Sequence, residues 1–168
     1  NGISIATTMP SLATFSAFTF EALVYRSSAT ARGMLLSEGY APFQWEVGLT
    51  GANYINMEIQ IDSVYYNFAS ASDALAGIGC YHIILSHTLS GGAWEYTVNS
   101  VSKGTGTQAG TAYAGGDIWR IGQHIGGATG WIGIIYEEKV YSRVLTAGEK
   151  QQHYQSAKTL ASILGYSI

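Results

Sequence analysis

The stretch FTFEALVY at residues 18–25 decides the fold, because its side chains alternate between two environments. Phe18, Phe20, Ala22 and Val24 are apolar and occupy every second position. Successive side chains of a β-strand point to opposite faces of a sheet, so this pattern predicts a strand with one apolar face. The aromatic and branched residues of the stretch favour a strand as well.

The same alternation returns in later stretches, at residues 43–49, 55–61, 94–98 and 119–121. Clusters rich in glycine and small polar residues separate such stretches and predict turns. These predicted turns are Ser37-Glu38-Gly39, Thr50-Gly51-Ala52-Asn53, Ser90-Gly91-Gly92 and residues 126–130. Short strands with frequent turns indicate an all-β sandwich or jelly roll of two antiparallel sheets.

One short C-terminal helix is predicted to begin after Thr146. The Thr146 hydroxyl can cap the free amides of the first turn, and Glu149 is placed to reach back in a capping box. The segment that follows, residues 150–158, is polar with few apolar side chains. We therefore expect the helix to lie on the sandwich rather than inside it.

Length and charge exclude several function classes. A chain of 168 residues fits one domain over residues 1–168, and no run approaches the ~18 apolar residues of a membrane span. The net charge is -3, and the eight Lys and Arg residues form no basic stripe, which argues against nucleic acid. Charged residues supply 11% of the chain, against about 25% in ordinary domains, so a neutral, hydroxyl-rich surface is expected.

The single cysteine, Cys80, excludes an internal disulfide and is expected to be a buried free thiol.

The segment from Gly130 to Glu149, with Ile121-Gly122 before it and Tyr154 after it, resembles the closing motif of laminin G-like domains in the concanavalin A-like superfamily. In that family a Gly-aromatic-x-Gly turn leads into a strand that ends Arg-Ile-Tyr-Asn-Arg-Ala-Leu, followed by a short capped helix. Here residues 130–133 and 139–145 fill those places. The resemblance implies a concanavalin A-like jelly-roll β-sandwich.

Upstream segments match the family in the expected order, so the resemblance runs from about residue 18 to residue 154. Residues 18–22 resemble the first core strand, residues 81–83 a Trp-His-x-Val element, and residues 94–100 a hairpin strand ending in Asp-Gly. Tyr136 stands where the family has an Asp, and Asn99-Ser100 replaces the Asp-Gly. Calcium binding is therefore not supported, and no cofactor is expected.

Glucanases of this superfamily need two carboxylates on one strand face that flank the scissile bond. The nearest sequence feature is Glu137-Glu138, but adjacent strand residues face opposite sides and cannot act together. We expect a solvated or salt-bridged pair of glutamates instead. No nucleophile elbow or comparable local motif supports other hydrolytic chemistry. The sequence therefore predicts a protein that is not an enzyme.

Metal ligation is not predicted, because the aspartates and histidines are dispersed one by one and no spacing is diagnostic. His82 occupies the place of a structural histidine in the family resemblance, so a hydrogen-bonded core or rim role is expected for it. A loop group of Asp117, Gln123 and His124 brackets a strand end near the glycine-rich turn and is a weaker candidate for a functional site.

Sugar recognition stacks an exposed aromatic ring on the sugar and places amides and carboxylates against its hydroxyls. Trp45, Trp94 and Trp119 fall on apolar strand faces and Trp131 fills the aromatic slot of the turn, so all four are expected in the core. Tyrosines in turn-rich stretches are better platforms, namely Tyr40, Tyr54 and Tyr113. The predicted ligand-binding residues are Asn53, Tyr54, Asn56, Tyr113, Asp117, Gln123 and His124.

Two functions from different classes follow. The first is a non-catalytic, lectin-like module that recognises carbohydrate or glycoconjugates and is displayed extracellularly, on a cell surface or on a virion. The second is a structural subunit or decoration protein of a virion, filament or surface layer that forms homo-oligomers or larger assemblies. Low charge favours the second, because little repulsion keeps copies apart. The uncharged ends, residues 1–20 and 159–168, are candidate docking arms, although residues 1–14 are equally suited to form the first strand.

Overall fold

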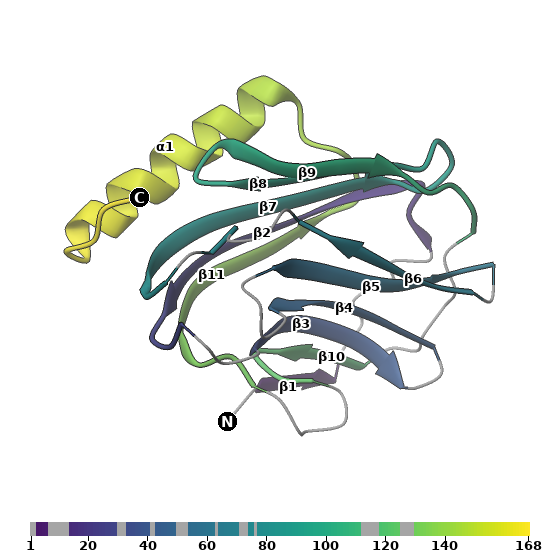
Figure 1. The fold of residues 1–168 in the computed structure, drawn as a ribbon, viewed down its shortest axis with the longest axis horizontal. Coiled ribbons are helices and arrows are strands. Elements are labelled where there is room, and N and C mark those ends of the chain that lie inside the picture. Colours follow the sequence, from purple (N-terminus) through teal and green to yellow (C-terminus); the bar gives the residue numbers. More distant parts are fainter. Residues whose placement is uncertain are drawn as a thin grey trace.

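The computed structural model describes residues 3–6, 14–29, 33–40, 43–49, 54–62, 64–70, 74–75, 77–111, 118–124 and 130–168. Its strands form two antiparallel sheets that pack face to face, and a helix lies on the outside of one of them (Figure 1). The predicted fold class, a jelly-roll sandwich of two antiparallel sheets with a C-terminal helix, is confirmed.

Hydrogen-bonded neighbours in both sheets run antiparallel. The six-stranded sheet has the order β1 (Ile3–Ala6), β10 (Ile118–Ile121), β3 (Gly33–Tyr40), β4 (Phe43–Leu49), β5 (Ile55–Ile61) and β6 (Val64–Ala69). The five-stranded sheet has the order β11 (Gly133–Tyr141), β2 (Ala17–Arg26), β7 (Gly79–Thr88), β8 (Ala93–Val98) and β9 (Val101–Thr107). Part of the N-terminal segment is therefore an edge strand.

The core lies between the sheets and is built from the alternating positions. The apolar side chains of β2 at positions 18, 20, 22 and 24 are fully buried there. Trp45 and Trp119 are buried in the same core, and Trp94 and Trp131 pack against it, which confirms the core role expected for the four tryptophans. Tyr96 of β8 donates its hydroxyl to the carbonyl of Phe68 in β6 at 2.6 Å, so one buried hydrogen bond joins the two sheets.

The helix α1 (Ala147–Ile163) begins as the sequence predicted. Thr146 accepts from the amide of Glu149, and the Glu149 carboxylate accepts from the amide of Thr146, which completes the capping box. At 17 residues the helix is longer than the short one expected. Ala157 and Ala161 are buried against the outer face of the five-stranded sheet, where they meet Leu23 and Cys80.

This helix changes the environment of the five-stranded sheet. Thr19, Glu21 and Leu23 of β2 point away from the core yet are buried. Cys80 is a buried free cysteine, as predicted, and burial raises the pKa of its thiol, which keeps it inert. After the helix, Tyr166 stacks on Tyr25 with ring centroids 5.0 Å apart. Residues 159–168, proposed above as a docking arm, thus contact a sheet of their own chain. Within the described residues, no helix is both long and apolar enough to span a bilayer.

The predicted turn Ser37-Glu38-Gly39 is wrong, because these residues lie inside β3. Its composition is that of a turn, but β3 is hydrogen-bonded on both sides, to β10 and to β4. Glu38 is paired with Trp119 and Trp45 and is buried on the core side. Pairing with two neighbouring strands overrode local propensity here. The predicted turn at 90–92 is confirmed, whereas residues 50–53 and most of 126–130 lie outside the described residues.

Strand β9 is not apparent in the sequence because Lys-Gly-Thr-Gly-Thr at 103–107 has no apolar alternation. Its glycines make room for an aromatic ring. A methyl group at Gly106 would lie 2.4 Å from a ring atom of Trp94. The hairpin between β8 and β9 turns at Asn99 and Ser100, which both have positive φ, 49° and 64°, as a two-residue hairpin with the favoured twist requires.

The two glutamates of β11 differ in environment. Glu137 lies 2.7 Å from Lys139 in an exposed ion pair, as expected. Glu138 is neither solvated nor paired, which corrects that half of the prediction. It is opposite Ala22 on the core side, and both carboxylate oxygens are buried with no hydrogen-bond partner among the described residues. Burial raises the pKa of Glu138 from 4.5 to about 8.

Glu138→Gln is expected to flatten the pH dependence of stability between pH 5 and pH 8. The pKa of this carboxyl is about 8 in the folded state and 4.5 as the ordinary value, so the unfolded chain ionises first and wild-type stability falls as pH rises through this window. With these two pKa values the loss of wild-type stability between pH 5 and pH 8 is on the order of 3 kcal/mol, and the variant lacks it. Urea unfolding at both pH values measures the difference. Equal slopes for the two proteins would show that Glu138 ionises normally in the fold.

Candidate functional site

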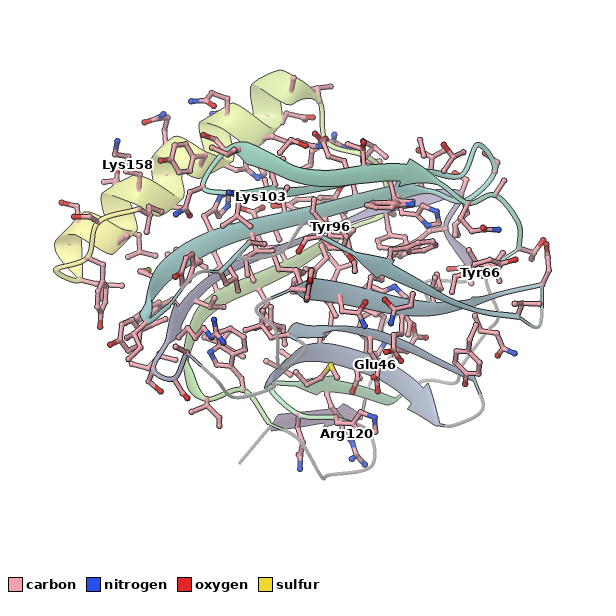
Figure 2. All side chains as sticks on the ribbon, viewed as in Figure 1. Glu46, Tyr66, Tyr96, Lys103, Arg120 and Lys158 are labelled. Carbon is pink, nitrogen blue, oxygen red and sulfur yellow. The ribbon has the colours of Figure 1, made fainter. Side chains whose placement is uncertain are left out.

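A row of polar side chains crosses the outer face of the six-stranded sheet. Strand register places Arg120, Ser37, Glu46, Glu58 and Asn67 directly opposite one another on β10, β3, β4, β5 and β6. Their chain neighbours on either side, such as the core tryptophans, point inward, so these five side chains share the outer face. Figure 2 labels two of them, on β10 and β4, on the far side of the sandwich from the helix.

Residues that follow β10 contact side chains of this row. The ring Nε2 of His124 lies 2.9 Å from Oε1 of Glu46. Ser37 donates its hydroxyl to the carbonyl of Gln123 at 3.0 Å, and the Arg120 guanidinium approaches the carbonyl of His124 at 3.5 Å. These contacts hold a cation, an imidazole and a carboxylate together on the middle of the sheet.

Strand β5 contributes polar side chains to the same face at every second position, namely Asn56, Glu58 and Gln60. Asn56 donates its amide to Glu58 at 3.0 Å, and Asn67 donates to the same carboxylate oxygen at 3.4 Å. Asn56 is 8% exposed and Gln60 is 5% exposed. The side-chain oxygens of both accept no hydrogen bond from the described residues. Buried amide oxygens nearly always have a partner, so these two are exceptions within the part of the chain that the structure describes.

An aromatic ring stands beside these amides. Tyr65 of β6 pairs with Gln60 across the sheet, and its side chain is 46% exposed. A neighbouring apolar ring and a set of amide and carboxylate acceptors suit a ligand that carries hydroxyl groups on an apolar framework.

Three of the predicted site residues meet at this face. Asn56 lies on it, and Gln123 and His124 contact it through Ser37 and Glu46. Tyr54 precedes β5 and is half-buried, and Tyr40 is the last residue of β3. Asn53, Tyr113 and Asp117 lie outside the described residues.

The sequence analysis missed the other members of the face. A signal was present, because the polar positions that alternate with the apolar ones in 43–49 and 55–61 had to share one face. Their partners on other strands follow only from the register. The members missed are Ser37, Glu46, Glu58, Gln60, Tyr65, Asn67 and Arg120.

A second polar cluster lies on the opposite side of the molecule, under the helix. Glu21 of β2 accepts from His82 of β7 at 3.0 Å, from His153 of α1 at 2.8 Å and from the hydroxyl of Tyr141 of β11 at 2.9 Å. A carboxylate can only accept, so both imidazoles present an N–H to it. Burial raises the pKa of Glu21, but these hydrogen bonds outweigh it and lower the pKa to about 2. The cluster fastens the helix to the sheet, which is the hydrogen-bonded role expected for His82.

No group of three or more histidine, cysteine, aspartate or glutamate side chains gathers as metal ligands within the part of the chain that the structure describes. The expectations about calcium and cofactors stay predictions.

Comparison with known proteins gives a consistent family and fold. A laminin G-type family model, described as the concanavalin A-like lectin/glucanases superfamily, matches residues 1–149. Among curated proteins, none matches the sequence. The CBM40 of Ruminococcus gnavus IT-sialidase, solved with alpha2,3 sialyllactose bound, has a TM-score of 0.69 at 20% identity and covers 88% of this chain and 93% of that chain.

Two further structures have the same fold. Botulinum neurotoxin type C, whose cell entry depends on interaction with two ganglioside molecules, has a TM-score of 0.66 at 10% identity and covers 86% of this chain and 36% of the toxin chain. A heptameric SAP-like pentraxin from Limulus polyphemus has a TM-score of 0.61 at 17% identity and covers 92% and 73% of the two chains. At these identities the likeness concerns the fold alone.

Proposed function

Because this chain belongs to the concanavalin A-like lectin/glucanases superfamily, we propose that it is a non-catalytic, lectin-like module that binds glycans on the outer face of its six-stranded sheet. The observation that carries the proposal is the row of polar side chains that strand register places on this face, beside the 46% exposed Tyr65. Amide, carboxylate and guanidinium groups can donate to and accept from sugar hydroxyls.

The remaining side chains of the face fit the same ligand class. Glu58, two residues before Gln60 on β5, and Asn67, opposite Glu58 on β6, offer further acceptors and donors. Tyr65 offers a half-exposed ring against which the apolar face of a sugar can stack. Arg120 adds a planar cation, which recognises carboxylates and so suits an acidic sugar.

The comparisons support this proposal over the structural one. The Ruminococcus gnavus module is a carbohydrate-binding module solved with sialyllactose, and the botulinum structure concerns gangliosides. By likeness to these structures, we propose extracellular or surface display for this module too. Assembly into a virion, filament or surface layer has no comparable support.

One observation favours hydrolysis instead. Glu46 and Glu58 are directly opposite each other on β4 and β5, so two carboxylates share one face of the sheet, as glycoside hydrolysis needs. Against this, Glu58 accepts hydrogen bonds from Asn56 and Asn67, and Glu46 contacts His124. Both carboxylates are thus engaged by neighbouring side chains of the protein instead of being presented to a substrate. Binding without cleavage is therefore the better interpretation.

Calorimetric titration with soluble oligosaccharides, sialylated and neutral, tests the proposal. We expect at least one to bind and Gln60→Ala to weaken its binding by about tenfold, because the variant removes a buried amide from the face. Gln155→Ala, which truncates an exposed glutamine of α1, is the matched control and leaves affinity unchanged.

The same samples decide between binding and hydrolysis. Chromatography after prolonged incubation recovers the oligosaccharide intact if the module only binds, whereas shortened products that disappear in Glu58→Gln would make it an enzyme. If no oligosaccharide binds at millimolar concentration, or if Gln60→Ala and Gln155→Ala behave alike, this face is not a glycan site.

A further inference from the structure

A cleft of about 380 Å³ lies between the helix and the five-stranded sheet, on the opposite side of the sandwich from the proposed glycan face. His82 and Ile84 of β7, Glu95 and Thr97 of β8, and Lys150 and Tyr154 of α1 line it. Figure 1 shows α1 running along the outside of this sheet, near β8 and β9. His82 and Ile84 are buried, and the other four side chains are half-buried, so the cleft has a floor and walls.

Contacts on each side hold the walls in place. Lys150 donates to Oε2 of Glu95 at 2.7 Å and so bridges the helix to β8 across the cleft. On the floor, His82 donates its ring N–H to Glu21, which also holds His153 of the helix. The amide of His82 donates to the side chain of Asn99 at 2.8 Å, which anchors the hairpin beside the cleft. A pocket with this support is largely preformed, as ligand sites usually are.

The cleft offers a mixture of donors and acceptors that the protein does not fully use. An ammonium group has several N–H donors, and the bond from Lys150 to Glu95 uses one of them. The Glu95 carboxylate has a second oxygen. The hydroxyls of Thr97 and, at the rim, Ser100 can both donate and accept.

This set selects for neutral hydroxyl groups. A sugar hydroxyl accepts from an ammonium while it donates to a carboxylate, so the Lys150 and Glu95 pair can hold one hydroxyl from both sides. The Glu95 carboxylate would repel an anion in the cleft, and the Lys150 ammonium would repel a cation. Ile84 and the ring of Tyr154 supply apolar surface for the C–H face of a sugar ring. The volume of about 380 Å³ lies within the ~300–1,000 Å³ range of small-molecule sites.

We propose that this cleft is a second saccharide-binding site, which takes a neutral hexose unit. The inference rests on the proposed function in that it treats the module as a glycan binder, but it uses none of the residues of the six-stranded sheet. Two sites on opposite faces make one module bivalent, so it can bind two branches of a glycan or two glycan chains. Bivalent attachment increases avidity without any new contact.

Amide chemical shifts recorded during titration with galactose, glucose and lactose test the proposal. We expect the amides of Ser100, Lys150 and Gln151 to shift with at least one of these sugars. Thr97→Val and Lys150→Met are each expected to weaken that binding at least fivefold. Lys158→Met, which removes an exposed lysine two turns further along the same helix, is the matched control and leaves it unchanged.

Each outcome bears on one site only. If the three amides do not shift at tens of millimolar of any of these sugars, or if Lys150→Met and Lys158→Met bind equally, the cleft is not a saccharide site. Gln60→Ala is expected to leave the shifts at the cleft unchanged. If the wild-type protein binds sugar at the cleft but no oligosaccharide at the six-stranded sheet, the proposed function of that face is overturned. If it binds at the six-stranded sheet but not at the cleft, this inference alone is overturned.

Discussion

Gly133→Ala is expected to destabilise the protein by about 4 kcal/mol, a large share of the ~5–15 kcal/mol that stabilises an ordinary domain. Gly133 has φ +150°, a conformation that side chains disfavour. A methyl group there would lie 1.8 Å from the carbonyl oxygen of Tyr25, which is backbone and has no freedom to move away alone. The same carbonyl accepts the indole N–H of Trp131 at 3.1 Å, so the substitution also disturbs that hydrogen bond.

Urea unfolding at pH 7 measures this loss against a matched control. Gly148→Ala makes the same change in the first turn of α1, where a methyl group meets nothing within 4 Å. Alanine favours a helix over glycine, so this control is expected to hold or gain up to about 1 kcal/mol. Similar unfolding midpoints for the two variants would mean that the backbone at Gly133 has room to relax.

Glu21→Gln is expected to cost about 3 kcal/mol at pH 7, because it removes a buried carboxylate while leaving in place the three groups that donate to it. His82, His153 and Tyr141 would then face an amide that accepts poorly and carries no charge. The folded pKa of about 2 lies below the ordinary 4.5. The contribution of Glu21 to stability is therefore present above pH 4.5 and is lost as pH falls from 4.5 towards 2.

Denaturant unfolding at pH 7 and pH 3 separates this effect from a general loss of charge. Wild type should lose stability between these values, and Glu21→Gln should lose less, since it has no carboxyl to protonate. Glu137→Gln removes an exposed carboxylate on the neighbouring strand and is expected to change stability by at most about 0.5 kcal/mol. If Glu21→Gln is as stable as this control, the cluster under the helix contributes nothing to the free energy of unfolding.

The family motif at residues 130–133 could be recognised from the sequence, and the structure gives its physical reason. Gly130 pairs with Gln123 in an isolated bridge. Trp131 donates its indole N–H to the carbonyl of Tyr25, and Gly133 lies too close to that carbonyl to carry a side chain. Trp131 and Gly133 are required by contacts with the carbonyl of Tyr25, more than a hundred positions earlier in the chain. A resemblance can therefore locate the motif, but composition and periodicity cannot explain it.

The candidate site was less accessible to sequence reasoning. Asn56, Gln123 and His124 were predicted for separate reasons, as an amide near a tyrosine and as members of a loop group. Their relation depends on the pairing of Ser37 with Glu46 and of Glu46 with Glu58, which joins three strands. A register shift of one residue would turn every one of these side chains into the core. The sequence of one strand does not specify how it is aligned with its neighbours.

The amino-acid sequence by itself determined the β-sandwich, the burial of the tryptophans and the capped start of the helix, because each depends on alternation or spacing within a few residues. Tertiary structure alone decided that Ser37-Glu38-Gly39 is strand, that Glu138 is buried and that polar residues of five strands meet on one face. It also placed the helix over Glu21 and so created the cleft. These features depend on which strands become neighbours and in what register, and that choice is made by the packing of the whole chain.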